Sequence, residues 1–260
     1  MELINFDSLN DRAEEIKKDY QSKKPFRYVM FEGFFKPEVV ESIYSSYPEI
    51  TTDGSWNGTT YIDQKKKFQK TEFEAGSIFN KVFTELNSPE FLKWLEYISE
   101  IDELEGDAEL FGGGLHQSIN GAFLNVHVDY NFHPTTKHHR RLNVLVYMNK
   151  EWKDDYEGHL ELWDLSNDKK TLLGKYAPEF NRCVIFETNE ISFHGHPKPL
   201  NTPDGVNRKS IATYYYSKTR PEKEIGPEHN TIYVNTEGLG GQLKRFNSGV
   251  KALLERINKK

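Results

Sequence analysis

The feature that most constrains the fold is a change in hydrophobic period near residue 109. Before this point apolar residues recur mostly at helical spacing, and from about Glu109 they alternate with polar residues in short runs separated by Gly, Pro, Asn and Asp. Alternation is typical of strands that bury one face, and many short strands favour an antiparallel sandwich or open barrel over a βαβ sheet. We therefore predict a mainly β core that follows a helical region.

These patterns predict a specific order of elements. Strands are expected near residues 109–118, 122–130, 141–148, 159–165, 170–176, 182–187, 191–194 and 209–216. Helices are expected after an N-cap at Ser8, from Pro37, across Ile78 to Leu86, and after the Ser88-Pro89 cap. A short strand at Tyr28 to Phe31, a strand at Thr231 to Val234, and a closing helix carrying Leu243 to Ile257 complete the order.

The chain is expected to form one domain in three parts. Its 260 residues are enough to bury a sizeable core. Residues 1–108 are the helical support, residues 109–217 the β core, and residues 218–260 a C-terminal strand and helix.

Charge and cysteine content narrow the functional class. A formal net charge of -6 argues against a general affinity for nucleic acid, and the basic runs Lys65 to Lys67 and Lys137 to Arg141 are expected in solvated loops. Cys183 is the only cysteine, which excludes an internal disulfide. The sequence has no apolar run of about 18 residues and no signal-peptide pattern at its start, so we expect a cytoplasmic protein without a membrane segment.

The run Asn125-Val126-His127-Val128-Asp129 carries the candidate chemistry. Strict alternation sends Asn125, His127 and Asp129 to one face of a strand. Burying a polar side chain without a partner costs roughly 2–7 kcal/mol, so these groups need a partner such as a metal. An imidazole and a carboxylate two residues apart, with a second imidazole, form the triad that holds Fe(II) and leaves positions open. Alone, His-x-Asp is a weak signal in a chain with nine histidines.

Two downstream segments strengthen the metal hypothesis. His194 follows a β-rich run and is the candidate third ligand, while His196 would share its face on a regular strand and competes for that position. Arg208 opens the last strand of the predicted core, with Ser210 on its own face. A buried Arg offers a bidentate fork to a carboxylate, and a neighbouring hydroxyl adds a further hydrogen bond.

Taken in order, these motifs resemble the prolyl-hydroxylase branch of the Fe(II)- and 2-oxoglutarate-dependent oxygenases. The resemblance covers roughly Leu110 to Ser217. Its elements are His127-Val128-Asp129, Leu145 to Trp152, Gly158 to Trp163, His194, and Arg208 with Ser210. The second element is similar to a Tyr-Leu-Asn-Lys-Asp-Trp run in oxygen-sensing prolyl hydroxylases.

The resemblance implies a double-stranded β-helix and a set of residue roles. His127, Asp129 and His194 would hold Fe(II), while Arg208 would pair with the C5 carboxylate of 2-oxoglutarate and Tyr147 would hydrogen-bond to it. With O2 as the second co-substrate, the family hydroxylates unactivated C–H bonds and releases succinate and CO2. Halogenation is disfavoured because Asp129 is present, whereas desaturation and cyclisation stay open. The substrate is expected to be a small molecule or a protein or peptide side chain.

Several residues depart from the family pattern or accompany it. Gln117 stands where the oxygen-sensing enzymes have a tyrosine ten residues before the first His ligand, so it is a candidate substrate contact. Asn125, which shares a face with the ligands, and Trp163 are further candidates. The loop 198–205 is a candidate border of the substrate entrance. Gly112 to Gly114 are expected to form a bulge or a close backbone approach. The other histidines are expected at the surface or in structural hydrogen bonds, namely His116, His133, His138, His139, His159 and His229.

A non-catalytic β-barrel binding protein, for instance for sugars, is the second hypothesis. Such a protein would retain a metal for structural reasons and would have no need of a carboxylate-pairing Arg208. The sequence leaves both a monomer and a homodimer open.

Overall fold

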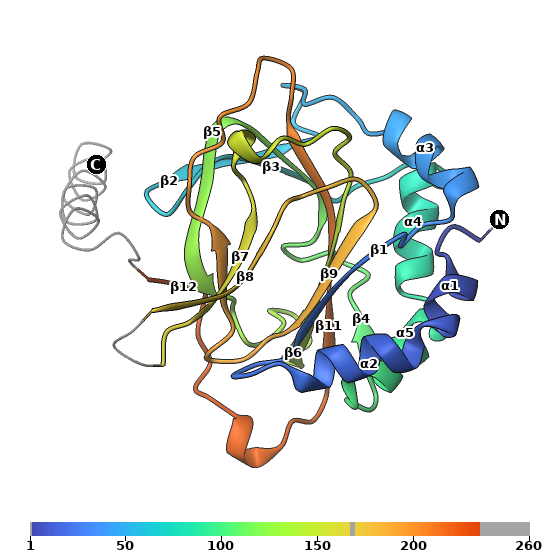
Figure 1. Ribbon diagram of the computed structural model, residues 1–260, viewed down its shortest axis with the longest axis vertical. Coiled ribbons are helices and arrows are strands. Elements are labelled where there is room, and N and C mark those ends of the chain that lie inside the picture. The colour runs from blue at the N-terminus through green and yellow to red at the C-terminus, as the bar shows by residue number, and fades with distance from the viewer. Residues whose placement is uncertain (1, 167–169, 235–260) are drawn as a thin grey trace.

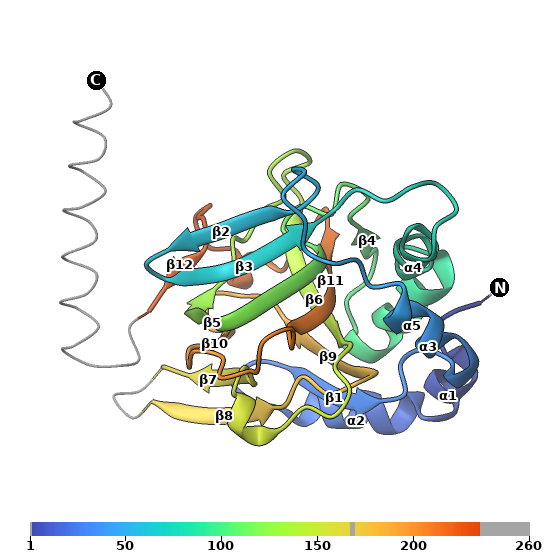
Figure 2. The same cartoon turned by 90° about the horizontal axis from the view of Figure 1, so that it is seen from above.

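Five helices gather on one side of the molecule. The structure is a computed structural model that describes residues 2–166 and 170–234. The helices are α1 (Phe6–Asp11), α2 (Ala13–Ser22), α3 (Pro37–Ser45), α4 (Ile78–Leu86) and α5 (Pro89–Ser99), and short 3-10 turns lie at Asp154–Tyr156 and Glu222–Glu224. Figures 1 and 2 show that the helices cover one face of a curled sheet.

The predicted helix starts are confirmed at three of four places. Pro37 is the first residue of α3, and the Ser77 and Ser88 side chains accept hydrogen bonds from the first turns of α4 and α5. The predicted Ser8 cap is wrong. Asn5 caps α1 instead by accepting from the Ser8 amide, and Arg12 separates α1 from α2.

The strands form one curled antiparallel sheet. They are β1 (Tyr28–Glu32), β2 (Asn57–Tyr61), β3 (Gln64–Lys70), β4 (Glu105–Gly106), β5 (Gly114–Val128), β6 (His139–Tyr147), β7 (Leu160–Asp164), β8 (Thr171–Tyr176), β9 (Arg182–Glu187), β10 (Phe193–His196), β11 (Arg208–Ser217) and β12 (Ile232–Tyr233). The main path runs β1-β9-β6-β11-β5-β10-β7-β8, while β3 and β12 also pair with β5. This arrangement is the predicted double-stranded β-helix.

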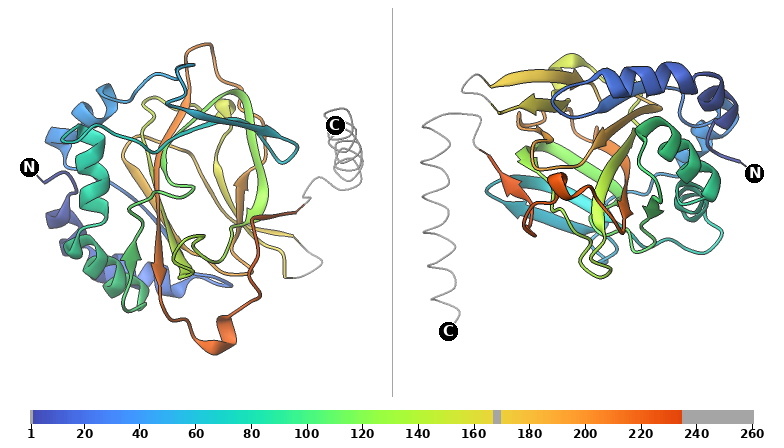
Figure 3. Two further views of the ribbon diagram at one scale, coloured as in Figure 1. Left: turned by 180° about the vertical axis from the view of Figure 1, so that it is seen from behind. Right: turned by 90° about the horizontal axis from the view of Figure 1, so that it is seen from below.

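Alternation along β6 separates two environments. Val144 and Val146 pack in an apolar cluster that includes the helices, whereas Asn143, Leu145 and Tyr147 line a cavity inside the curled sheet. Successive side chains of a strand point to opposite faces, so the sheet can bury one face against helices and keep the other for a site. Figure 3 shows the helices together on one side of the strands.

Strand β5 is longer than predicted and organises the sheet. It spans 15 residues, joining the two strands expected near 109–118 and 122–130. Its first half lies between β11 and β3, and its second half pairs with β10 and β12. Side chains from distant parts of the sequence therefore meet along one strand.

The prediction that the two basic runs lie in solvated loops is wrong for the first run and only partly right for the second. Lys65 to Lys67 belong to β3, which pairs with β5, and Lys67 is half-buried. In the second run Lys137 is exposed in a loop, but Arg140 and Arg141 belong to β6 and are buried. Pairing with neighbouring strands places these residues in the sheet, and the local sequence shows no apolar alternation that would predict it.

The C-terminal part is confirmed only as far as it is described. The strand predicted at Thr231 to Val234 appears as β12, and the predicted closing helix at Leu243 to Ile257 lies outside the described residues. Within residues 2–166 and 170–234, none of the helices has the length and apolar character needed to cross a membrane. The three-part division of the chain stays a prediction.

Candidate metal centre

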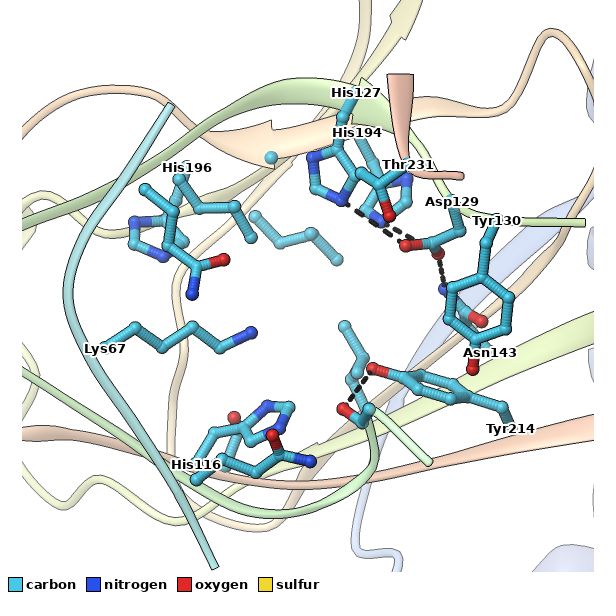
Figure 4. Close-up of a pocket in the computed structure, with 18 of the residues that line it drawn as sticks. Lys67, His116, His127, Asp129, Tyr130, Asn143, His194, His196, Tyr214 and Thr231 are labelled. Atoms are coloured by element: carbon cyan, nitrogen blue, oxygen red, sulfur yellow. Dashed lines mark hydrogen bonds and ion pairs between the residues drawn. The ribbon is translucent and has the colours of Figure 1, made fainter. Parts of the chain in front are cut away.

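His127, Asp129 and His194 meet inside the curled sheet. His127 and Asp129 come from the end of β5 and the residue after it, and His194 lies opposite His127 on β10. His127 Nε2 is 3.5 Å from Asp129 Oδ1, and His194 Nε2 is 3.4 Å from Asp129 Oδ2. One ligand atom from each residue lies within 4.8 Å of the others, and no other such group of three His, Cys, Asp or Glu residues occurs in the described chain. Figure 4 shows the three side chains converging.

The backbone orients both imidazoles for metal binding. His127 Nδ1 lies 2.8 Å from the carbonyl oxygen of Asn125, and His194 Nδ1 lies 2.9 Å from that of Ser192. An Nδ1–H that donates to a carbonyl leaves the Nε2 lone pair free, which is the tautomer that a metal requires. Burial lowers the pKa of His194 to about 3, with a further decrease from His127, so His194 is neutral. The donor set therefore fits a divalent metal such as Fe(II).

Asp129 is held from behind by a buried cation and an amide. Arg140 Nη2 lies 3.0 Å from Asp129 Oδ2, and Asn143 Nδ2 donates to the same oxygen at 2.7 Å. Arg140 also donates from Nε and Nη2 to Asn143 Oδ1. Burial alone would raise the pKa of Asp129, but Arg140 and the imidazoles of His194 and His127 hold it well below its usual range. The carboxylate is therefore ionised before any metal binds.

Arg140 itself is fixed by two aromatic rings. Its guanidinium carbon is 3.5 Å from the ring centroid of Tyr214 and 4.4 Å from that of Tyr130. Cation–π contacts of this kind stabilise a desolvated guanidinium by about 2 kcal/mol. Tyr214 and Tyr130 are further anchored because their hydroxyls donate to the carbonyls of Gly112 and Phe111.

Arg208, Tyr147 and Ser210 line the same cavity, as the sequence predicted for a carboxylate site. Arg208 is 7% exposed, donates from Nε to the Gly158 carbonyl at 2.7 Å and from Nη2 to the Tyr147 hydroxyl at 3.2 Å. Ser210 pairs with Tyr147 across β11 and β6. These contacts fix the plane of the guanidinium beside a phenol, which is suited to binding a carboxylate.

The three candidate substrate contacts are held by other partners, and their contact with a substrate stays a prediction. Between its pairings with His194 and His196, β5 has one extra residue, and Leu124 lines the cavity in place of Asn125. Asn125 Nδ2 instead donates to Asp63 Oδ1. Gln117 is fully buried and donates to the Pro48 carbonyl. Trp163 donates to Glu161. None of the three lines the cavity.

His196 lines the cavity without joining the triad. The same register shift separates His196 from His194, so that His196 pairs with Leu124 and stands apart from the three clustered residues. Within the described residues it is therefore His194 that clusters with His127 and Asp129, and the third ligand position stays a prediction. His116 also lines the cavity, contrary to its expected structural or surface role. Burial lowers the pKa values of His116 and His196 well below the usual range, so both rings are neutral.

The glycine run, two other histidines and the loop 198–205 lie outside the triad. The Gly run does make a close approach, since a Cβ on Gly114 would lie 2.3 Å from the Lys70 carbonyl oxygen. His159 is 2.8 Å from Asp154 and His229 is 2.8 Å from Glu190, in line with structural roles. The loop 198–205 does not contribute to the cavity lining.

The cavity has a volume of about 230 Å³ and contains residues that sequence reasoning missed. Lys67 from β3 and Arg140 from β6 both face into it, although both belong to basic runs that were expected in solvated loops. Tyr61 and Tyr233 line it as well, and their hydroxyls are hydrogen-bonded to each other. Figure 4 shows Lys67 across the open space from the triad, with His116 and His196 on either side of it.

Comparisons with known sequences agree with this geometry. Residues 113–216 match the family model described as the 2OG-Fe(II) oxygenase superfamily. A mouse relative, prolyl 3-hydroxylase OGFOD1, is 30% identical over 92 residues, which are 34% of this chain and 16% of the mouse protein. The similarity to that relative therefore spans a small part of its length.

Comparisons with solved structures agree on the fold. A prolyl-4-hydroxylase from Pseudomonas putida is 14% identical, has a TM-score of 0.54, and the match covers 78% of this chain and 98% of that one. A prolyl 4-hydroxylase from Phytophthora capsici is 16% identical, has a TM-score of 0.55, and the match covers 97% of this chain and 79% of that one.

Proposed function

We propose that the chain is an Fe(II)- and 2-oxoglutarate-dependent hydroxylase, because residues 113–216 match the model of the 2OG-Fe(II) oxygenase superfamily. The observation that carries the proposal is the meeting of a two-His-one-carboxylate triad and a buried arginine in one cavity. A metal site alone needs no Arg208, and a carboxylate site alone needs no triad. The non-catalytic binding protein is therefore not favoured.

This proposal assigns tasks to six polar side chains of the cavity. His127, Asp129 and His194 hold the metal, and Arg208 with Tyr147 binds the C5 carboxylate of 2-oxoglutarate. Ser210 lies beside Tyr147 and adds a hydroxyl to that end of the cavity. Bound Fe(II), with 2-oxoglutarate and O2, supplies oxidative decarboxylation and hydroxylation of a C–H bond, with succinate and CO2 as products.

The protein supplies orientation and charge control. The carbonyls of Asn125 and Ser192 fix the two rings, and Arg140 fixes the Asp129 carboxylate, so that the triad is formed before the metal arrives. Partners of this kind on metal ligands typically change metal affinity 10–100-fold when removed. The substrate class proposed is a small molecule or a peptide side chain.

Anaerobic spectroscopy tests the metal and co-substrate roles together. Adding Fe(II) and 2-oxoglutarate is expected to give the weak visible charge-transfer band of the chelate, and His127→Ala or Asp129→Ala should abolish it. His229→Ala is the matched control, because this histidine pairs with Glu190 away from the triad. A folded, iron-loaded wild type without the band would refute the proposal.

Arg208→Ala separates the co-substrate site from the metal site. We expect weaker 2-oxoglutarate binding by calorimetry with metal binding retained, because Arg208 contacts Gly158 and Tyr147 and none of the ligands. Lys209→Ala is the control, since its side chain lies on the opposite face of β11. Unchanged affinity in Arg208→Ala would assign the carboxylate site elsewhere. Succinate production in oxygen then tests turnover.

A further inference from the structure

Lys67 lies in the same cavity, two strands away from Arg208. Arg208 pairs with Ser118 of β5, and Ser118 pairs with Lys67 of β3. Neighbouring strands are about 4.8 Å apart, so the Cα atoms of Lys67 and Arg208 are roughly 10 Å apart. Both side chains line the cavity, and Figure 4 shows the Lys67 ammonium directed into it, facing the metal triad.

The Lys67 ammonium forms no ion pair in the part of the chain that is described, and the carboxylate of Asp129 attracts it only at longer range. No carboxylate oxygen of residues 2–166 or 170–234 lies within 4.0 Å of its Nζ, and no hydrogen bond or ring contact involves that group. Its neighbour Lys66 donates to the Asn120 carbonyl at 2.8 Å, and Lys65 is exposed. A half-buried, unpaired ammonium is costly, so its position inside a cavity points to a ligand.

Two other polar atoms beside Lys67 also lack partners. His116 Nε2 and His196 Nδ1 are buried and form no hydrogen bond. The two residues are only 6% and 4% exposed. Figure 4 places these two rings on either side of the Lys67 side chain. Buried polar atoms in native proteins nearly always have partners, so this wall is incomplete without a polar ligand.

The charge balance of the cavity gives the sign of that ligand. Three cations, Lys67, Arg140 and Arg208, and one carboxylate, Asp129, line it, with the histidines counted as neutral. The side chains therefore leave a formal charge of +2. Fe(II) adds two positive charges and 2-oxoglutarate adds two negative charges, so the loaded cavity keeps the same excess.

We propose that Lys67, flanked by His116 and His196, is the subsite for an anionic group of the primary substrate, a carboxylate or a phosphate. The proposal rests on the proposed function, because it assigns 2-oxoglutarate to the metal and to Arg208. Once one carboxylate of 2-oxoglutarate binds the metal, the other is satisfied by Arg208 and Tyr147. Lys67 then remains for a different ligand.

Anion binding to the protein loaded with Fe(II) and 2-oxoglutarate tests the subsite. Acetate and inorganic phosphate are titrated separately and anaerobically, with the charge-transfer band and calorimetry as readouts. We expect one of the two anions to bind wild type, to bind Lys67→Met at least tenfold more weakly, and to bind Lys67→Arg with little change. Lys65→Met is the matched control on the same strand, and it should bind as wild type does.

The same variants show whether Lys67 binds the primary substrate or the co-substrate 2-oxoglutarate. The Kd of 2-oxoglutarate should stay within twofold in Lys67→Met. A tenfold weaker Kd for 2-oxoglutarate would assign Lys67 to the co-substrate and overturn the proposal. Equal anion binding by wild type and Lys67→Met, or no binding of either anion by wild type, would also overturn it. Loss of the band in wild type would instead refute the proposed function.

Discussion

The two walls of the cavity differ in how completely their polar groups are paired. On the Asp129 wall, Arg140 and Asn143 share hydrogen bonds with the carboxylate, and two tyrosine rings enclose the guanidinium. On the Lys67 wall, an ammonium and two ring nitrogens have no partner within the described chain. Groups that pair with each other stabilise the folded site, whereas unpaired groups that line a cavity remain free to bind a ligand. Substitutions on the two walls should therefore act in opposite ways.

The largest effect is expected on the paired wall, from Arg140→Met. This change leaves the buried Asp129 carboxylate without its cation, and breaking a buried pair typically costs about 3–5 kcal/mol. We expect the free energy of unfolding of the metal-free protein to fall by about that amount, measured by urea denaturation with a chelator present.

Lys137→Met is the control for Arg140→Met. Lys137 pairs with Glu228, and both side chains are more than half exposed, so its loss should change the free energy of unfolding by less than about 1 kcal/mol. Equal losses in the two variants would show that burial of the Arg140 pair has no special energetic role.

A smaller effect is expected for Asn143→Ala, which removes the second donor to Asp129. The carboxylate keeps Arg140 but loses a 2.7 Å hydrogen bond that fixes its orientation. We expect Mn(II) affinity, followed by electron paramagnetic resonance, to fall about 10–100-fold. Asn201→Ala, in an exposed loop, should leave Mn(II) affinity unchanged. Wild-type affinity in Asn143→Ala would contradict the positioning role.

On the unpaired wall, anion affinity should depend on pH through Lys67. Burial lowers the pKa of Lys67 to about 8, and the amine binds an anion only when protonated. Binding is therefore retained below this pKa and lost above it, by about tenfold between pH 7 and pH 9. Calorimetry of wild type and Lys67→Arg should show the loss only in wild type, because the guanidinium stays charged. The same pH profile in both proteins would exclude Lys67 as the titrating group.

The smallest effect, and one of opposite sign to that of Arg140→Met, is expected for the stability of Lys67→Met. Burial and repulsion by Arg208 and Arg140 outweigh the attraction of the Lys67 ammonium to Asp129. Removing the ammonium breaks no hydrogen bond, so unfolding of the metal-free protein should cost the same or up to about 1 kcal/mol more. Urea denaturation measures this directly. A clear destabilisation would show that Lys67 has an internal partner and would remove the contrast between the two walls.

The sequence predicted the residues whose signals are local. His127 and Asp129 stand two positions apart on one strand, and Arg208 with Ser210 repeats that spacing, so alternation brings each pair to one face. His194 and Tyr147 followed from the resemblance to a family. The structure brings all of these side chains to one cavity, while their roles at the metal and the co-substrate stay proposals.

The missed residues depend on long-range pairing. Lys67 enters the cavity because β3 pairs with β5, and the polar sequence of β3 gives no apolar pattern that would predict a strand. Asn125 leaves the predicted face because one extra residue in β5 shifts the alternation. Arg140 looked like part of a solvated basic run, and its burial is explained by its ion pair with Asp129 and its enclosure by aromatic rings.

Strand β12 is a short strand beside the part of β5 that carries His127. Within the described residues Ile232 and Tyr233 pair with Val128 and His127, Val234 donates to the Val126 carbonyl, and the Tyr233 ring lies 5.3 Å from the His127 ring. Short segments of this kind open locally at a fraction of the cost of global unfolding. Amide hydrogen exchange at β12 should therefore be faster than in the middle of β5. Tyr233 contacts His127 and lines the cavity, so a ligand that orders the Tyr233 ring should also slow the local opening of β12. Slower amide exchange at β12 would then report that the cavity is occupied.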